Sequence, residues 1–178
     1  MDNVTHALAG LLLAESTVAL ASRRAPVSPG FRRTALVLGV VCAELPDADL
    51  VYAGPALGMG KLGYMLHHRG HTHTVLFALV GALVVWGIAL AIARGVRERP
   101  HERRWLLALA ATGTLVAHIG LDWTNSYGVH PFWPLDNRWY YGDSVFIVEP
   151  WLFVAAIPPL LVLTRSLVVR VLLGLALV

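Results

Sequence analysis

Histidine and aspartate side chains recur in four separate parts of the 178-residue sequence, each next to an apolar stretch. Imidazole and carboxylate together form the ligand set of zinc, iron, manganese and nickel sites. Ionisable side chains at membrane depth are costly, and they usually face a cavity or one another. The combination therefore predicts a metal centre. The candidate ligands are His6, Asp47, Asp49, His68, His73, His118 and Asp122.

The spacing within two of these segments favours convergence on one centre. His118 and Asp122 are four residues apart, so on a helix their side chains share one face. Asp47 and Asp49 would diverge by about 200° on a continuous helix. Pro46, however, disfavours helical geometry at the residue before it and removes an amide donor. We therefore predict a local break that lets both carboxylates turn to one centre.

The spacing of the histidines between residues 67 and 73 leaves two arrangements open. On a helix, His67 and His71 would pair at i, i+4, whereas His68 and His73 would lie about 140° apart. Thr72 has the character of an N-cap, which indicates that a helix begins only there. His68 would then lie in a loop and could converge with His73 on the first turn.

Each segment taken singly also has a structural interpretation. A histidine such as His6 near a helix start is more often an interfacial or capping residue than a ligand. His118 and Asp122 can form a hydrogen-bonded pair between packed helices, and the segment from Pro46 to Asp49 can be a turn that ends a helix. The occurrence of all four segments at one membrane level favours the metal site.

The composition is that of an integral membrane protein. Hydrophobic residues make up 57% of the chain and charged residues 14%, whereas a globular domain carries about 25% charged residues. Mean hydropathy is +0.64. Five apolar stretches, near residues 4–21, 34–52, 72–93, 105–121 and 145–163, approach the length needed to cross a core of about 30 Å. A sixth, residues 166–178, is either a short terminal helix or part of a longer protein.

These stretches predict an all-α fold, a polytopic membrane helix bundle of five to six transmembrane helices in a single domain over residues 1–178. The positive-inside rule orients it. Most basic residues fall on one side of a simple serpentine, which places the N-terminus and the candidate ligands on the outer side. The basic residues on the inner side are Arg23, Arg24, Arg32, Arg33, Arg94, Arg97, Arg99, Arg103, Arg104, Arg165 and Arg170.

The remaining composition excludes several classes of protein. Cys42 is the only cysteine, so a disulfide scaffold is excluded. Met1-Asp2-Asn3 has no basic residue, so we expect the first stretch to be retained and not removed as a signal peptide. The net charge of +3 reports topology, and we expect no nucleic-acid partner. Membrane lipid is the expected partner, with anionic lipid at the arginine-rich loops; the sequence does not set the oligomeric state.

The motifs occur in an order that is similar to one known family. The sequence resembles the bacterial YdjM-like family, described as LexA-binding, inner membrane-associated, metal-dependent hydrolases, over about residues 1–150. Its most specific element is an HRGxTHS-type box, in which Thr74 replaces the usual serine. The matching residues are Thr5-His6, Pro46-Asp47-x-Asp49, His68-Arg69-Gly70-x-Thr72-His73, His118-x-x-x-Asp122, Tyr127-Gly128 and Pro131-Phe132-Trp133-Pro134.

The resemblance implies the seven candidate ligands as the site and a location in the bacterial inner membrane. It sets His67 and His71 aside and favours a loop position for His68. Seven ligands exceed the three plus water of one catalytic zinc and suit one or two divalent ions, zinc first, with manganese or iron as alternatives. Two ions bridged by a carboxylate would suit phosphoester hydrolysis.

Asp49 and Arg69 are the predicted catalytic residues. Arg69 would clamp a phosphate bidentately or, alternatively, form a salt bridge to one of the aspartates. We therefore expect a metal-dependent hydrolase acting on a phospholipid or a lipid-linked phosphate. The alternatives are a metal-binding transporter and a structural or regulatory membrane protein. A transport site usually lies near the midplane, whereas here only Glu15 and Glu44 extend inward.

Overall fold

A computed structural model describes residues 1–51, 68–164 and 171. Within them the chain is helical, apart from loops and two isolated bridge pairs, Asn125–Val145 and Val129–Tyr140. The predicted all-α class is confirmed for this part of the chain. The α-helices are α1 (Asn3–Arg24), α2 (Pro29–Glu44), α4 (Val75–Ile92), α5 (Arg94–Arg97), α6 (Pro100–Thr114), α7 (Leu121–Thr124) and α8 (Pro150–Leu163).

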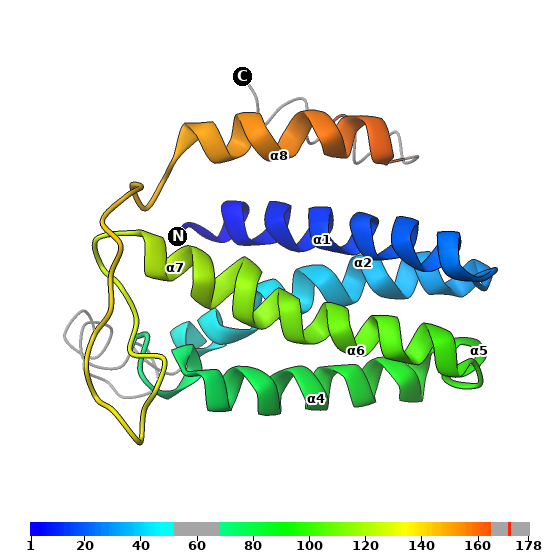
Figure 1. Cartoon of the computed structure of the whole chain (residues 1–178), viewed down its shortest axis with the longest axis horizontal. Helices are drawn as coiled ribbons and strands as arrows, with labels where there is room; N and C mark the ends of the chain where they lie inside the picture. The colour runs from blue at the N-terminus through cyan, green and yellow to red at the C-terminus, as the bar shows by residue number, and fades with distance from the viewer. Residues whose placement is uncertain (52–67, 165–170, 172–178) are drawn as a thin grey trace.

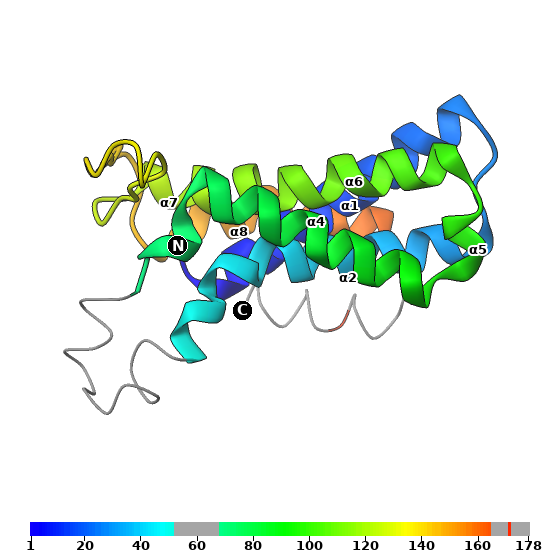
Figure 2. The ribbon, with the colours of Figure 1, turned by 90° about the horizontal axis from the view of Figure 1, so that it is seen from below.

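The helices α1, α2, α4 and α6 run lengthwise beside one another, and α8 lies along α1 (Figure 1). Figure 2 shows the same bundle turned by 90°, with α5 at one end and the loops after α7 at the other. The core is built from small and medium side chains, including Ala14, Phe31, Cys42, Leu106 and Leu109, all of which are buried. Close packing of these side chains supplies the van der Waals contacts that hold transmembrane helices together.

Two glycines let α1 and α2 approach closely. A Cβ atom on Gly39 would lie 2.5 Å from the carbonyl oxygen of Gly10, and one on Gly10 would lie 2.5 Å from that of Gly39. Neither position can therefore carry a side chain without a shift of backbone. Small residues at such crossings let transmembrane helices pack backbone against backbone.

Three helical segments are long and apolar enough to cross a membrane: Asn3–Arg24, Val75–Ile92 and Pro100–Thr124. The predicted second and fifth spans correspond to α2, with 16 residues, and α8, with 14. At 1.5 Å per residue these two helices are only about 24 and 21 Å long. The count of five to six spans therefore stays a prediction. The sixth stretch, apart from Val171, lies outside the described residues.

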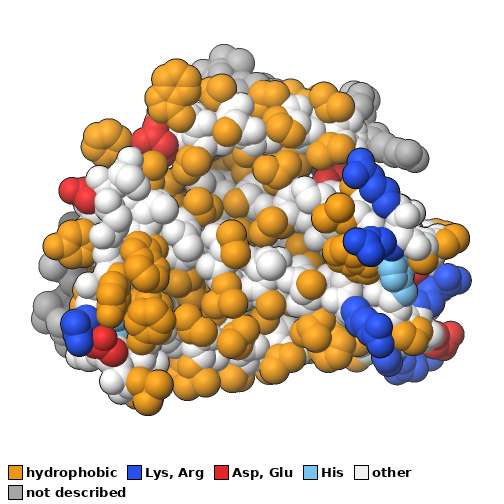
Figure 3. Space-filling view, in the orientation of Figure 1, with side chains coloured by type: hydrophobic (Ala, Val, Ile, Leu, Met, Phe, Trp, Pro, Cys, Tyr) orange, Lys and Arg blue, Asp and Glu red, His pale blue; other side chains and the backbone are white. Residues whose placement is uncertain are grey.

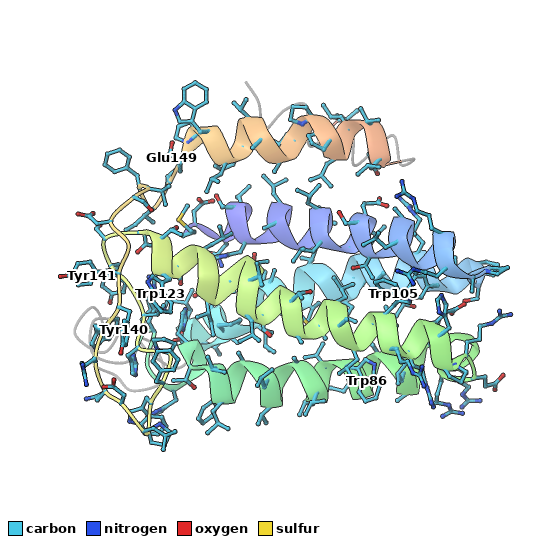
Figure 4. All side chains as sticks on the ribbon, viewed as in Figure 1. Trp86, Trp105, Trp123, Tyr140, Tyr141 and Glu149 are labelled. Carbon is cyan, nitrogen blue, oxygen red and sulfur yellow. The ribbon has the colours of Figure 1, made fainter. Side chains whose placement is uncertain are left out.

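The two ends of the bundle differ in chemistry. Most of the basic side chains visible in Figure 3 gather at the α5 end. At that end Glu102 is 1% exposed and accepts hydrogen bonds from the backbone N–H and the hydroxyl of Ser28, at 2.5 and 2.7 Å. At the opposite end, aromatic residues such as Trp123, Tyr140 and Tyr141 surround the loops, whereas Trp86 and Trp105 lie toward the α5 end (Figure 4). Aromatic residues at both ends are typical of membrane interfaces.

Candidate metal centre

Four predicted ligands meet at the end of the bundle opposite α5. His73, His118 and Asp122 are fully buried, and Asp47 is 9% exposed. His73 Nε2 lies 3.1 Å from His118 Nε2, and 3.3 Å from both Asp47 Oδ1 and Asp122 Oδ2. His118 Nε2 lies 3.4 Å from Asp47 Oδ1 and 3.6 Å from Asp122 Oδ2. Tetrahedral ligand atoms about 2.0–2.1 Å from a zinc ion are about 3.4 Å apart, so these four atoms fit the shell of one such ion.

Backbone carbonyls set the orientation of two histidines at this end of the bundle, His118 and His6. The Nδ1 atom of His118 lies 2.5 Å from the carbonyl oxygen of Ala43, and that of His6 lies 2.8 Å from the carbonyl of Ala117. A carbonyl can only accept, so Nδ1 carries the proton in both rings and Nε2 is left with its lone pair. This is the arrangement that metal-ligating histidines usually have.

His6 and Asp122 contribute polar atoms that have no hydrogen-bond partner in the described part of the chain. His6 Nε2 and Asp122 Oδ2 are both buried without a hydrogen bond, and His6 Nε2 lies 3.5 Å from Asp122 Oδ1. The imidazole of His6 stacks on that of His118, with ring centroids 3.9 Å apart. A buried polar atom without a hydrogen bond is costly. Asp122 belongs to the four-ligand set, whereas the groups of ligand atoms within 4.8 Å of one another that the described residues form do not include His6.

Asp49 and His68 form a second part of the cluster, next to Asp47. His68 Nδ1 lies 3.0 Å from Asp49 Oδ1. The other carboxylate oxygen of Asp49 accepts from the hydroxyl of Thr72 at 2.8 Å and the backbone N–H of Arg69 at 2.9 Å. Asp47, Asp49 and His68 also offer ligand atoms within 4.8 Å of one another. These three residues would suit a second ion, or they would orient the set formed by Asp47, His73, His118 and Asp122.

Arg69 has the alternative role considered from the sequence, a salt bridge to an aspartate. Its Nη2 atom donates to Asp122 Oδ1 at 2.8 Å, and its Nη1 atom donates to the carbonyl of Gly128 at 2.9 Å. The side chain is only 4% exposed, and its Cζ atom lies 4.6 Å from the ring centroid of Tyr127. The backbone of Arg69 has a φ of 62°, a left-handed conformation that is uncommon for residues other than glycine and concentrates at functional sites.

Local breaks in helical geometry place these side chains. The helix α2 ends at Glu44, and a 3-10 segment, Leu45–Asp49, follows through Pro46, which confirms the predicted break. His118 lies in a π-helical segment, Leu115–Gly120, and π-helical turns are frequent at functional sites. His118 and Asp122 lie on one face, as predicted, with His118 Nε2 3.6 Å from Asp122 Oδ2. The helix between them is not a regular α-helix.

The histidine segment has the loop arrangement, with one correction to its cap. His68 lies in a turn, and His71–His73 form a 3-10 turn before α4. The N-cap is Thr74, whose hydroxyl accepts from Phe77 N at 3.2 Å, and not Thr72 as predicted. The Thr72 hydroxyl is used by Asp49 instead, which explains why it does not cap the helix.

Three supporting residues, Met1, Asn3 and Asn125, were not identified from the sequence. Asn125 is fully buried, and its Oδ1 accepts from the backbone N–H groups of Tyr127 and Gly128 at 2.9 and 3.1 Å. The side chain of Asn3 donates to Glu44 at 2.8 Å and to Asp47 at 3.4 Å, so Glu44 contacts the site through Asn3. The N-terminal ammonium of Met1 forms an ion pair with Asp122. Single asparagines carry no spacing pattern, so no sequence signal marked them.

Several polar residues remain outside the cluster. His71 is exposed and lies against Trp133, with ring centroids 4.4 Å apart, and His67 is outside the described residues. Glu15 pairs with Arg32, as an inter-helix contact. In the loop after α7, the backbone N–H of Arg138 donates to Asp136 at 2.9 Å and lowers the pKa of this carboxyl.

A family model and one relative that match the chain are both described as inner membrane proteins. The chain matches, over residues 1–178, the model of the family described as YdjM inner membrane protein. It is 32% identical over 119 residues to the inner membrane protein YbcI of Escherichia coli strain K12, which covers 65% of this chain and 63% of YbcI. No solved structure matches the chain.

A second relative is more distant. The chain is 22% identical over 155 residues to the uncharacterized protein YfhP of Bacillus subtilis strain 168, which covers 87% of this chain and 44% of YfhP. The matched region therefore spans less than two thirds of the length of both relatives. Neither relative's name states an activity.

Proposed function

The chain belongs to the YdjM inner membrane protein family, and we propose that it is a membrane-embedded, metal-dependent hydrolase. Its proposed substrate is a phospholipid or a lipid-linked phosphate. The observation that carries the proposal is the set of four ligand atoms of Asp47, His73, His118 and Asp122, all 3.1 to 3.6 Å from a histidine Nε2 of the set. Zinc is the ion that this donor set suits best, with manganese or iron as alternatives.

The side chains around this set have the properties that hydrolysis needs. A bound divalent ion would supply Lewis acidity and lower the pKa of a coordinated water. Asp49 and His68 form a carboxylate–imidazole pair that can hold or release a proton. The guanidinium of Arg69 lies 2.8 Å from Asp122. It would therefore stand beside a phosphate that binds the ion.

An apolar cavity beside the ligands supports a lipid-borne substrate. It has a volume of about 170 Å³ and lies between α1, α7 and α8. Thr5 and Leu121, which line it, directly precede His6 and Asp122 in the sequence. Leu8 and Ala156 provide apolar walls. A hydrocarbon chain in this cavity would bring its head group to the level of the ligands.

The enzyme hypothesis is favoured over a transporter by the charges along the bundle. A transport path needs polar groups that continue inward from the site. Glu15, the mid-helix carboxylate of α1, is instead paired with Arg32, and Glu44 is engaged by Asn3. A metal that only holds helices together remains the third alternative, which the activity assay separates from the first.

Metal content and hydrolysis, measured on the same purified protein, test the proposal. We expect one to two equivalents of zinc, manganese or iron, together with chelator-sensitive hydrolysis of phospholipids or polyprenyl phosphates. His73→Ala should lose both properties. His71→Ala is the matched control, because His71 is exposed and two residues away on the same short turn, and it should keep both.

The outcomes separate the alternatives. Equal metal content in the two variants would refute the metal site. Normal metal content without hydrolysis of any lipid substrate would refute the hydrolase and leave a structural or transport role for the ion. Hydrolysis that survives both the chelator and His73→Ala would show that the activity does not use this centre.

A further inference from the structure

A second cavity lies far from the metal centre, between α2 and α4 near the α5 end. It is a groove of about 540 Å³, lined by α2 from Gly30 to Val41 and by α4 from Val85 to Ala93. The two helices contact each other along the bundle and approach α5 together (Figure 2). Apart from Arg33 and Thr34, its lining residues are apolar or glycine. The groove therefore has a long apolar part and one polar end.

Positive charge is concentrated at the polar end of the groove. Arg33 lines it, is exposed, and has no ion-pair partner among residues 1–51 and 68–164. The short helix α5 adds the exposed Arg94 and Arg97, and it lies close to the start of α2, because a Cβ atom on Gly30 would be 3.9 Å from Val96 Cγ2.

Two of the three neighbouring carboxylates, those of Glu15 and Glu102, are already engaged, so they do not cancel this charge. Glu15 is paired with Arg32. Glu102 is buried and accepts two hydrogen bonds from Ser28, with Arg99 at 3.8 Å. Glu98, on the exposed end of α5, is the remaining acidic group nearby. Arg33 is thus an arginine free to meet an external anion at the mouth of an apolar groove.

We propose that this groove binds one anionic phospholipid, with its phosphate at Arg33 and an acyl chain along Val37, Val41 and Ile88. The groove joins apolar walls to a guanidinium that has no ion-pair partner among the described residues, and on a chain from an inner membrane protein family this juxtaposition matches both halves of such a lipid. A soluble anion would use only Arg33, and a neutral lipid only the apolar walls. The inference does not depend on the proposed hydrolase activity.

Lipid retention by the purified full-length protein tests this site. Native mass spectrometry compares phosphatidylglycerol with phosphatidylcholine of the same acyl chains, and inorganic phosphate alone serves as the probe for a free anion. We expect a preference for phosphatidylglycerol that falls about fivefold in Arg33→Gln, the effect of one arginine near an anionic surface. Arg104→Gln removes the same charge from an exposed position of α6 outside the groove and should keep the preference.

A second variant tests the apolar part of the site. Val37 is 60% exposed and lines the groove, so Val37→Trp fills it without disturbing the core and should reduce retention of phosphatidylglycerol. Equal retention of the two lipids by the wild type, or equal losses in Arg33→Gln and Arg104→Gln, would overturn the proposal. Unchanged retention in Val37→Trp, binding of phosphate alone, or a dimer formed through this face without lipid selectivity would do the same.

Discussion

The buried charges at the ligand end do not balance among themselves. The three carboxylates of Asp47, Asp49 and Asp122 are buried together, and Arg69 is the buried guanidinium that faces them. The ammonium of Met1 also pairs with Asp122. Three carboxylates against these two cations leave one unpaired negative charge, and burying unpaired charge is costly. A divalent cation among these residues would supply the missing positive charge, which is why we favour a metal centre over a network of hydrogen bonds.

Asn125 is the side chain whose removal tests this end of the molecule most cleanly. Asn125→Ala would leave the backbone N–H groups of Tyr127 and Gly128 without their acceptor, at a cost of about 1–3 kcal/mol in the free energy of unfolding. It would also remove a support of Arg69 (3.4 Å) and weaken metal binding by about 10- to 100-fold, as loss of such supporting bonds does.

Thermal unfolding and metal titration measure these two effects. The control is Asn137→Ala, an exposed asparagine in the loop after α7, for which we expect neither change. If Asn125→Ala unfolds and binds metal like Asn137→Ala, the hydrogen bonds of Asn125 have no role in holding the site.

The crossing of α1 and α2 determines where two candidate ligands lie. His6 is on α1, and Asp47 follows directly on α2, so the distance between these helices sets the distance between the ligands. Gly39→Ala would place a methyl group 2.5 Å from the carbonyl oxygen of Gly10. We expect a loss of about 1–3 kcal/mol in the free energy of unfolding, typical of overpacking, and a lower metal content.

Gly87→Ala is the matched control for this prediction. Nothing lies within 4 Å of a Cβ atom at Gly87, and alanine is favoured over glycine inside a helix by about 0.5–1 kcal/mol. The melting temperature should therefore stay the same or rise. Equal behaviour of the two variants would mean that α1 and α2 tolerate separation at this crossing.

The sequence predicted the local breaks near the candidate ligands better than the lengths of the helices that carry them. The break at Pro46 follows from proline chemistry, and the pairing of His118 with Asp122 follows from their spacing, so both could be read directly. The π-helical turn at Leu115–Gly120 could not, because no residue type marks it. Thr72 was predicted as the cap because spacing cannot show that Asp49, 23 residues away, competes for its hydroxyl.

Helix lengths show a similar limit. The apolar stretch near residues 34–52 is continuous in hydropathy, but the helix α2 has only 16 residues before the 3-10 turn begins. The stretch near residues 145–163 likewise yields α8 with 14 residues. Hydropathy counts apolar residues, whereas the helix ends where backbone geometry and capping groups end it.

The whole molecule has two ends that are expected on opposite sides of the membrane. The ligands and the aromatic loop form one end, and the arginines of α5 lie at the other (Figures 1 and 3). The excess of arginine predicts that the α5 end faces the cytoplasm. Cysteine labelling can test this, because the only native cysteine, Cys42, is fully buried.

We expect Asn137→Cys to react with a membrane-impermeant thiol reagent in intact cells. Glu98→Cys, an exposed position at the α5 end, should react only after the membrane is permeabilised. The reverse pattern would invert the orientation and place the metal centre in the cytoplasmic half. Labelling of both positions in intact cells would contradict a single orientation.

The spread of the ligands along the chain has a consequence for biosynthesis. His6 precedes its neighbour Asp122 by 116 positions, and Asp122 lies on the segment that follows α6. A nascent chain that ends before α7 thus holds imidazoles and carboxylates in the membrane without the last ligand. If the proposed centre binds a metal, the complete set can capture the ion only after that segment has been translated and inserted, and metal loading would then be a late event in maturation.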